Sequence, residues 1–167
     1  SDGSLGSAVR DAGTVLSTTA ASSRNIFTYT SGGITRFSTP TFSAPTCSGC
    51  LNQSVTASNL AVTTDTARDA VVGYIRGESA YNPDDWKLGD IFHSNAVTIG
   101  SPSSFFNDTL DSNNAYSTFR DGHQRTSANG LRRIVVGAND GQFHAFKISD
   151  DPSVDLSETW SFIPPNL

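Results

Sequence analysis

The stretch that most constrains the fold of this chain is residues 132–148, RRIVVGANDGQFHAFKI. Two runs rich in β-branched and aromatic residues flank the tetrapeptide Ala-Asn-Asp-Gly. Asn, Asp and Gly accept the backbone conformations of tight turns at the least cost, so a turn is predicted between the two runs. The predicted turn residues are Gly137, Asn139, Asp140 and Gly141. The stretch therefore predicts a β-hairpin that pairs residues 134–137 with residues 142–146.

The residues around this hairpin complete a pattern of four strands. Residues 88–100, LGDIFHSNAVTIG, predict the innermost strand of the same unit, with strand segments at Ile91 and at residues 96–99 that are interrupted near His93. Residues 158–163, ETWSFI, predict a strand after the hairpin that Pro164 and Pro165 terminate. This order, with an Asp-Gly turn and a Trp in the last strand, is typical of one blade of a quinoprotein-like β-propeller. A single blade leaves both apolar faces in water. We therefore expect the remainder of a propeller, or a second chain, to cover it.

Strand alternation also assigns side chains to the two faces of the blade. Phe143 and Ala145 are predicted on one face, and His144 and Phe146 on the other. Trp160 is expected to lie against a neighbouring sheet or against the helix predicted at residues 66–76.

The composition bounds the fold class and excludes some functions. The 167 residues are 36% hydrophobic and 16% charged and include no Met, which favours a single module that is mainly β with one clear α-helix. The formal charge of -5 argues against a nucleic-acid partner, because phosphate binding needs clustered Lys and Arg. No apolar run reaches the roughly 20 residues that a membrane helix needs, so no membrane span is expected.

One helix is predicted at residues 66–76. Thr64 or Asp65 can cap its start, and Gly77 is suited to the left-handed exit of a helix. Its apolar residues recur at helical spacing and predict a buried stripe made of Ala67, Ala70, Val71, Tyr74 and Ile75. A shorter helix is proposed near residues 4–11.

The first half of the chain also predicts a hairpin and a long insertion. Residues 24–30 and 34–37 are predicted strands, joined by a Ser-Gly-Gly turn. Residues 38–61 and 103–130 are interpreted as loop insertions into an incomplete propeller domain, because both are long for connections in a compact domain.

The two cysteines lie in the first insertion as Cys47-Ser-Gly-Cys50. We expect a local disulfide formed in an oxidising compartment. A thioredoxin-like redox pair and two inert thiols are the alternatives. Haem attachment is disfavoured because Leu51 stands where a His is needed, and zinc is disfavoured because two further ligands are missing nearby.

We interpret the candidate catalytic and metal-binding residues as structural residues. His93 and His144 lack a third ligand at suitable spacing, so hydrogen bonding within the sheet is expected rather than a metal pair. Asp140 is interpreted as a turn residue. Ser94 and His93 are adjacent in the sequence, but adjacency does not make a catalytic pair, because such groups are assembled in space. Weak calcium candidates, which lack the Gly and Glu of an EF-hand, are Asp108, Asp111 and Asn113. No enzyme activity is predicted, and no cofactor is expected in this segment.

Several ordered blocks carry a resemblance to one family. They are residues 11–30, DAGTVLSTTAASSRNIFTYT; residues 70–78, AVVGYIRGE; residues 87–102, KLGDIFHSNAVTIGSP; residues 133–146, RIVVGANDGQFHAF; and residues 158–167, ETWSFIPPNL. Together they resemble the C-terminal propeller domain of the type IV pilus tip adhesins of the PilC/PilY family. Arg10 departs from the family, in which an aromatic residue often precedes Asp-Ala-Gly. The family's propeller is also much longer than this chain.

The resemblance implies a fold and a function. It implies one propeller blade with the elements that lead into it, in a non-enzymatic component of a pilus tip adhesin that contributes to surface attachment and to control of pilus assembly and extension. The implied partners are minor pilins and a host or abiotic surface, and the implied location is the cell surface or pilus tip, reached through the periplasm. Calcium is implied for the complete family domain. The alternatives are a quinoprotein-like dehydrogenase, which would hold a quinone and calcium, and an assembly factor that touches no surface.

Overall fold

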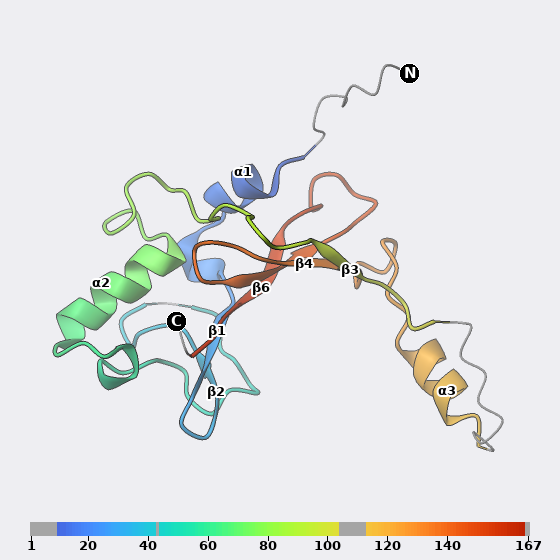
Figure 1. Cartoon of the computed structure of the whole chain (residues 1–167), viewed down its shortest axis with the longest axis horizontal. Helices are drawn as coiled ribbons and strands as arrows, with labels where there is room; N and C mark the ends of the chain where they lie inside the picture. The colour runs from blue at the N-terminus through green and yellow to red at the C-terminus, as the bar shows by residue number, and fades with distance from the viewer. Residues whose placement is uncertain (1–9, 43, 104–112, 166–167) are drawn as a thin grey trace.

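A single six-stranded sheet organises the chain (Figure 1). The computed structural model describes residues 10–42, 44–103 and 113–165. The strand order is β2-β1-β6-β5-β4-β3. The strands are β1 Ile26–Thr30, β2 Gly33–Arg36, β3 Val97–Ile99, β4 Arg133–Gly137, β5 Phe143–Lys147 and β6 Glu158–Ile163. The helices are α1 Ala12–Ser17, α2 Asp65–Arg76 and α3 Ala115–Gly122, with 3-10 turns at Ala21–Ser23 and Ser58–Leu60. The mainly β prediction is confirmed.

Strands β3 to β6 form an antiparallel meander, as one propeller blade requires. The predicted hairpin is confirmed, since β4 pairs with β5 from Gly137 opposite Phe143 to Arg133 opposite Lys147. Of the turn residues, only Gly141 adopts a positive φ, at 79°. Asp140 acts through its side chain, because its Oδ1 accepts a hydrogen bond of 2.9 Å from the backbone N–H of Gln142.

Of the strands predicted at residues 88–100, the run at residues 96–99 is confirmed by β3 and the interruption near His93 is confirmed, whereas no strand forms around Ile91. Only β3 pairs with β4, and the residues before it run beside the blade without strand pairing. His93 takes a left-handed conformation, with φ of 58°, which interrupts an extended strand. Two hydrogen bonds hold the segment instead: the Gly137 N–H donates to Ser94 Oγ at 3.1 Å, and the Asn139 N–H donates to the Asp90 carbonyl at 2.9 Å.

The leading hairpin, β1 and β2, joins the blade through a parallel pairing of β1 with β6. Ile26 lies opposite Ser161, and the Thr28 hydroxyl donates to the Ile163 carbonyl at 2.8 Å. The predicted hairpin is confirmed, with Gly32 at φ 107° in its turn. The parallel seam extends the four-stranded blade into the six-stranded sheet.

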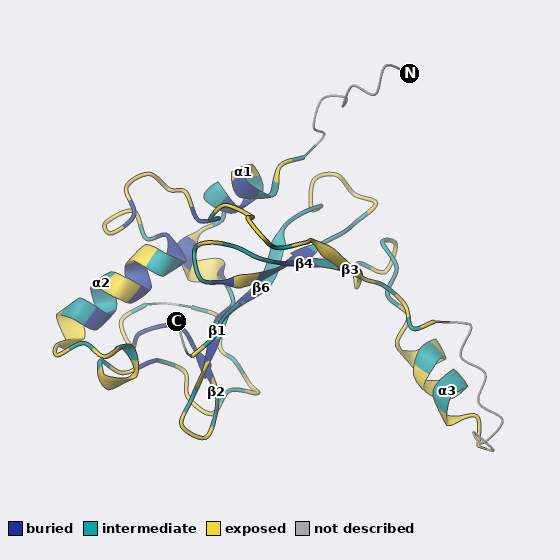
Figure 2. Cartoon of the chain, in the orientation of Figure 1, coloured by how far each residue is buried: buried dark blue, intermediate teal, exposed yellow. Residues whose placement is uncertain are grey.

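Helix α2 has the predicted ends but presents a different face to the core. The Thr64 hydroxyl caps it by accepting from the Ala67 N–H at 3.1 Å, and Gly77 ends it at φ 83°. The predicted apolar stripe is wrong, because Val71 and Tyr74 are 39% and 58% exposed (Figure 2). The buried residues are Arg68, Val72, Gly73 and Arg76. The hydrogen bonds of Arg76 to interior carbonyl groups, described below, orient this face inward.

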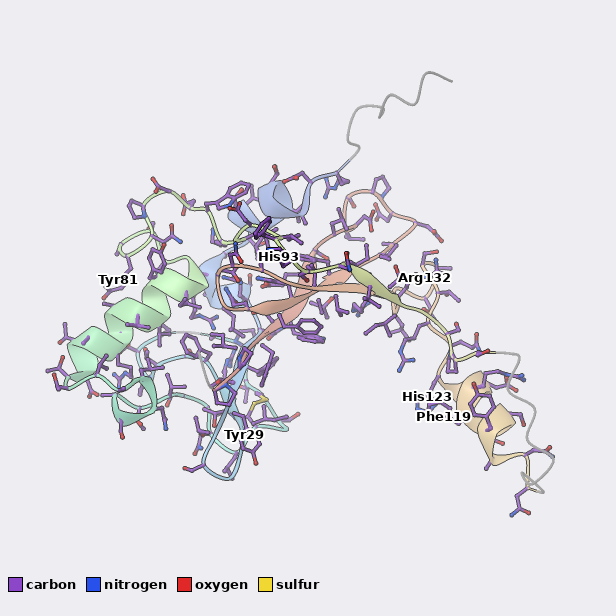
Figure 3. All side chains as sticks on the ribbon, viewed as in Figure 1. Tyr29, Tyr81, His93, Phe119, His123 and Arg132 are labelled. Atoms are coloured by element: carbon purple, nitrogen blue, oxygen red, sulfur yellow. A yellow bond between two sulfur atoms is a disulfide. The ribbon has the colours of Figure 1, made fainter. Side chains whose placement is uncertain are left out.

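Two further helices correct the prediction. The structure places α1 at Ala12–Ser17, where the Asp11 carboxylate caps it by accepting from the Thr14 N–H at 2.7 Å. Most of the helix proposed near residues 4–11 lies outside the described residues, and Arg10 and Asp11 are not helical. The second insertion was predicted as a loop, yet it contains α3 on an arm that projects away from the sheet (Figure 1). Ring contacts stabilise α3 locally, with Phe119 stacked on His123 at 4.2 Å between centroids (Figure 3).

Two buried apolar clusters form the core. One contains Leu16, Leu88, Val136 and Phe146. The other contains Ile26, Phe37, Val55 and Val72. Val55 belongs to the first insertion, which turns back along β2 and forms ladder-like backbone hydrogen bonds to Ile34, Arg36 and Ser38. The insertion thus covers the exposed edge of the sheet as well as part of the core.

Candidate functional site

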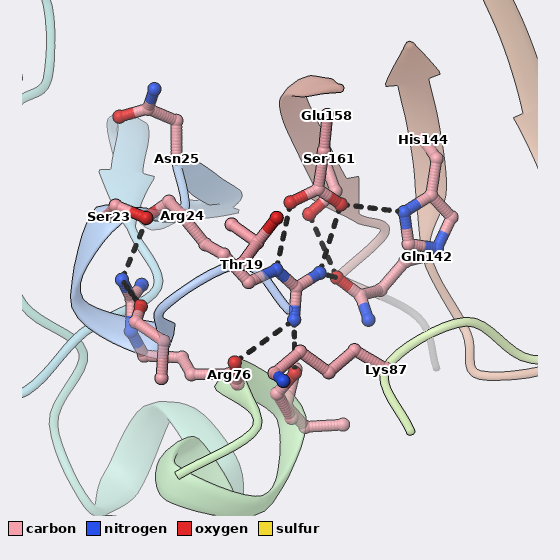
Figure 4. Close-up of polar contacts among 12 residues, drawn as sticks. Thr19, Ser23, Arg24, Asn25, Arg76, Lys87, Gln142, His144, Glu158 and Ser161 are labelled. Atoms are coloured by element: carbon pink, nitrogen blue, oxygen red, sulfur yellow. Dashed lines mark hydrogen bonds and ion pairs between the residues drawn. The ribbon is translucent and has the colours of Figure 1, made fainter. Parts of the chain in front are cut away.

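A buried row of charged side chains lies where the leading segment meets the blade (Figure 4). Arg24 Nε lies 2.8 Å from Glu158 Oε2, and Arg24 Nη2 lies 2.9 Å from Glu158 Oε1. His144 Nδ1 lies 2.8 Å from the same Glu158 Oε1. On the other side of the ring, His144 Nε2 lies 3.0 Å from Asp140 Oδ2. Cationic and anionic groups therefore alternate along the row.

The strands place these groups because alternation directs every second side chain to the same face. His144 and Phe146 stack on one face of β5 with ring centroids 5.6 Å apart, as predicted. His144 lies opposite Ser161 of β6. The Ser161 hydroxyl donates to Gln142 Oε1 at 2.8 Å, and Arg24 Nη2 donates to the same oxygen at 3.3 Å. The cluster is thus held by three separate segments of the chain.

The pKa shifts follow from burial opposed by charge pairing. Burial alone raises the pKa of Glu158, but the hydrogen bonds and charges of His144 and Arg24 outweigh it and lower that pKa from 4.5 to about 2. Burial likewise raises the pKa of Asp140, but His144 outweighs it and the net shift is downward. Burial lowers the pKa of His144, but Asp140 and Glu158 outweigh it and the net pKa lies above 6.5. The shifts favour a protonated imidazole between two carboxylates.

This arrangement suits a structural clamp better than catalysis. The His144 side chain is completely buried, and both of its ring nitrogens already face carboxylates. No ring nitrogen is left to act as a general base or to bind a metal ion. The interpretation of His144 as a hydrogen-bonding residue of the sheet agrees with this geometry. The interpretation of Asp140 as a turn residue is incomplete, because its carboxylate also belongs to the charged row.

A second buried guanidinium anchors α2 beside the row. Arg76 donates to the carbonyl oxygens of Ala21, Arg24 and Phe37 at 2.7, 2.8 and 3.0 Å. Burial, together with the charges of Arg36 and Arg24, lowers the pKa of Arg76 to about 10. Arg24 Nη1 in turn donates to the carbonyl groups of Ile75 and Arg76 at the end of α2. The helix and the leading segment are therefore fastened to each other by two arginines.

A polar cavity of about 530 Å³ adjoins the charged row. It lies between α2, residues 86–90 and the turn at residues 139–142. Asp140 Oδ2 accepts a hydrogen bond of 2.9 Å from the Gly89 N–H, and Lys87 Nζ donates to the Ser17 carbonyl at 2.7 Å. These contacts fix the cavity wall against the blade.

An apolar groove of about 470 Å³ lies on the sheet. Its lining residues are Phe27, Ile34, Cys47, Gly49, Phe143, Trp160 and Phe162. Trp160 lies beside Phe143, with ring centroids 6.1 Å apart. α2, one of the two expected neighbours of Trp160, contributes no residue to this groove. Ile34 and Phe143 are 49% and 39% exposed, so this face of the blade presents apolar side chains to solvent.

The remaining sequence candidates occupy separate places. Cys47 and Cys50 form a disulfide in the first insertion. His93 is exposed with its ring beside that of Phe92 (Figure 3). Of the calcium candidates, Asp108 and Asp111 lie outside the described residues, and Asn113 is an exposed turn residue. In the described part of the chain no helix is long and apolar enough to cross a membrane, and no three His, Cys, Asp or Glu residues form a metal-binding group.

Sequence reasoning missed the partners of His144. A lone His between Phe143 and Ala145 in an apolar strand signals a buried polar contact. Nothing in the sequence names Arg24 and Glu158 as members of that contact, because they lie 134 residues apart.

Comparisons with known proteins agree with this architecture. The family model of the PilY1 beta-propeller domain matches residues 88–167, which contain the whole β3–β6 meander. The type IV pilus biogenesis factor PilY1 of Pseudomonas aeruginosa strain PAK is 34% identical over 108 residues, which are 60% of this chain and 8% of that protein. PilY1 of strain UCBPP-PA14 is 29% identical over 163 residues, which are 92% of this chain and 13% of that protein. No solved structure matches the chain.

The lengths and the names of the matched relatives both bear on this chain. The chain spans between 8% and 13% of the length of these relatives. The relatives are named as pilus biogenesis factors, so the comparisons do not favour the quinoprotein-like dehydrogenase. The meander matches a propeller domain, and the five ordered sequence blocks reach from the leading segment through the blade. The β3–β6 meander therefore matches the PilY1 beta-propeller family, and the chain is similar to the PilY1 proteins of type IV pili.

Proposed function

We propose that the chain contributes a propeller blade to a non-enzymatic component of the type IV pilus tip, which takes part in surface attachment and in control of pilus assembly and extension. The observation that carries the proposal is the coincidence of the β3–β6 meander with the match to the PilY1 beta-propeller domain. The names of the relatives support the pilus role.

The division of labour follows from the geometry. The sheet and its buried charged row form a rigid scaffold, and scaffolds of this kind present function on their loops. Residues 38–61 and 103–130 are the longest insertions, and they expose Leu51 at 60% and Phe119 at 46%. We assign surface attachment to these two insertions, and α3 lies on the arm that the second one forms.

The proposed partners follow from the uncovered faces. The apolar groove beside Trp160 is the surface that another blade, or a second chain, covers in a complete propeller. Minor pilins at the tip and a host or abiotic surface complete the proposed set of partners. The protein reaches the cell surface or pilus tip through the periplasm, an oxidising compartment in which the Cys47–Cys50 disulfide can form.

The attachment role is tested in the bacterium that makes the protein. Its gene is replaced by a version in which residues 103–130 are exchanged for a short Gly-Ser linker, and pilus number and adhesion are measured. We expect pili at normal number and a loss of adhesion. The control exchanges the acidic loop at residues 150–155 for Gly and Ser residues of equal number and keeps adhesion. Unchanged adhesion by the first variant refutes the assignment to this insertion, whereas a loss of pili assigns it to assembly.

The absence of enzymatic activity needs its own test. The protein purified from those cells is incubated with calcium and the quinone cofactor of quinoprotein dehydrogenases. Dye-linked oxidation of alcohols and sugars is then measured. We expect no turnover above the buffer control. Turnover that requires the quinone refutes the non-enzymatic assignment.

A further inference from the structure

Arg36, at the end of β2, carries two buried guanidinium nitrogens that have no hydrogen-bond partner among the described residues. The residue is 3% exposed. These nitrogens are Nε and Nη2, and neither forms a hydrogen bond within the part of the chain that the structure describes. The hydroxyl of Ser38, a residue that is 2% exposed, is buried without a partner as well. Two neighbouring donor groups are therefore buried without an acceptor among residues 10–42, 44–103 and 113–165.

Such an arrangement is costly unless another group completes it. Buried polar groups in folded proteins are hydrogen-bonded with few exceptions, and an unpaired buried charge is more costly than an unpaired neutral group. The two other buried arginines of this region are paired through most of their nitrogens, although Arg76 Nε is also buried without a partner among the described residues. Arg24 pairs with Glu158, and Arg76 donates to three carbonyl oxygens. Arg36 lacks an equivalent partner.

The surrounding charge adds to the imbalance. The positive charge of Arg36 contributes to the lowered pKa of Arg76, so the two guanidinium groups repel each other. Burial also lowers the pKa of Arg36 itself. The buried carboxylate of Glu158 is already shared between Arg24 and His144. Among the described residues around Arg36, positive charge therefore exceeds negative charge.

Arg36 and Ser38 line a cavity of about 350 Å³. Its other lining residues are Thr39, Pro40, Phe42, Ala44, Thr46, Gln53 and Ser54. These described residues include hydroxyl and amide groups but no carboxylate. The volume lies in the range of small-ligand sites. Size and chemistry thus both allow a small anionic group to enter.

The walls of the cavity are fixed before any ligand binds. The Arg36 N–H donates to the Asn52 carbonyl at 3.0 Å, and the Val55 N–H donates to the Ser38 carbonyl at 2.9 Å. The side-chain amide of Gln53 forms two hydrogen bonds with the backbone of Cys47, beside the disulfide. These contacts therefore hold the backbone of Arg36 and Ser38 in place at the cavity wall.

We propose that this cavity binds an oxyanion group, a carboxylate, sulfate or phosphate, with the Arg36 guanidinium as its charge partner and the Ser38 hydroxyl as a further donor. A guanidinium presents parallel N–H groups that match two oxygens of such a group. The anion comes either from a free ligand or from an acidic side chain elsewhere in the protein as the cell makes it. The site goes beyond the proposed function, because its chemistry is independent of any role at the pilus.

Thermal unfolding of the protein purified from its own cells tests the free-ligand source. Sodium sulfate, and separately phosphate, replaces chloride at constant ionic strength. We expect a saturable rise of Tm, and at sulfate a hundredfold above Kd the ratio of folded to unfolded protein rises about 100-fold. Arg36→Gln abolishes the saturable rise, whereas Arg120→Gln, which removes the same charge from α3, keeps it. General exclusion of sulfate from protein surfaces raises Tm without saturation and equally in all variants.

A second set of measurements tests whether an acidic side chain of the protein itself occupies the cavity. With an acidic side chain already in the cavity, sulfate has no saturable effect, Arg36→Gln lowers Tm, and that loss shrinks at acidic pH as the carboxylate takes up a proton. Arg36→Lys keeps the charge without the paired N–H groups, and it provides the comparison where Arg36→Gln does not fold. Its weakened sulfate affinity supports the proposal, and an unchanged affinity overturns it. An equal effect of sulfate on the Tm of the wild type and of Arg36→Gln overturns the proposal. The proposal also fails if sulfate has no effect and Arg36→Gln leaves Tm unchanged or raises it.

Discussion

Arg24 and Glu158, 134 residues apart in the chain, form an ion pair with two contacts of 2.8 and 2.9 Å. Their side chains are 0% and 1% exposed. Arg24 lies just before β1 and Glu158 begins β6, so the pair lies at the start of the parallel seam between these strands. This pair fastens the leading hairpin to the blade.

Glu158→Gln is expected to destabilise the protein by about 3–5 kcal/mol, because it leaves the buried charges of Arg24 and His144 without their shared carboxylate. Urea unfolding at neutral pH measures the change. The chain contains one other glutamate, Glu78, for which no side-chain hydrogen bond or ion pair is seen with the described residues. Glu78→Gln therefore serves as the control and has a small effect. Equal losses in the two variants contradict a special role for Glu158.

The free energy of unfolding is expected to depend on the protonation of His144. The folded-state pKa is raised above 6.5, so the stabilisation is fully present below pH 6.5 and is lost as pH rises through the raised folded pKa. Urea unfolding between about pH 5 and pH 9 measures this dependence. His144→Gln removes it, whereas the control His123→Gln, at the exposed residue that follows α3, keeps it. A wild-type stability that increases over this pH range has the wrong sign for the proposed pairing.

Acid has the opposite effect on Glu158. Its folded-state pKa is lowered to about 2, so the stabilisation is present above its ordinary value of 4.5 and is lost as pH falls toward about 2. Circular dichroism during acid titration follows the unfolding. Glu158→Gln should flatten this limb of the stability profile, and a limb that stays as steep as in the wild type argues that other carboxylates cause the acid unfolding.

Gly89→Ala is expected to cost about 1–3 kcal/mol, because a Cβ atom at Gly89 lies 2.4 Å from the backbone nitrogen of Asp140 and forces the turn away. Gly100→Ala is the matched control, since a Cβ atom there meets nothing within 4 Å. Urea unfolding of the two variants gives the comparison. The close packing of the cavity wall on the blade is disproved by a neutral Gly89→Ala.

The Cys47–Cys50 disulfide is expected to contribute no more than about 2 kcal/mol to global stability, because it spans only three positions and removes little entropy from the unfolded chain. The double variant Cys47→Ser with Cys50→Ser gives the stability difference in urea. Mass spectrometry before and after thiol labelling, under native oxidising conditions, determines whether the bond is present. Two labelled cysteines contradict both the bond and the assignment to an oxidising compartment.

Local signals in the sequence predicted the elements that depend on local contacts. The turn at residues 138–141 specifies its hairpin, and Thr64 with Gly77 specifies the ends of α2, because turns and caps are short-range interactions. The interruption near His93 was also predicted, whereas the strand expected around Ile91 does not form. His93 adopts a left-handed backbone, a conformation in which His is enriched together with Asn and Asp.

Long-range polar contacts account for most of what the sequence did not reveal. The buried face of α2 is set by Arg76, whose carbonyl acceptors come from other segments, and an apolar periodicity cannot detect such partners. The same holds for the charged row, in which the turn residue Asp140 acquires a second role only when β5 and β6 bring His144 and Glu158 together. Tertiary context decides these features.

The parallel seam between β1 and β6 has a consequence for the order in which the chain folds. Thr28 and Ile163, joined by a hydrogen bond across the seam, are 135 residues apart. Contacts of such large separation form slowly, and ribosomes add only about 5–20 residues per second. The edge of β1 that pairs with β6 therefore stays unpaired until β6 has been synthesised. During that interval the nascent chain is open to folding factors, and equally to mispairing with other unfinished strands.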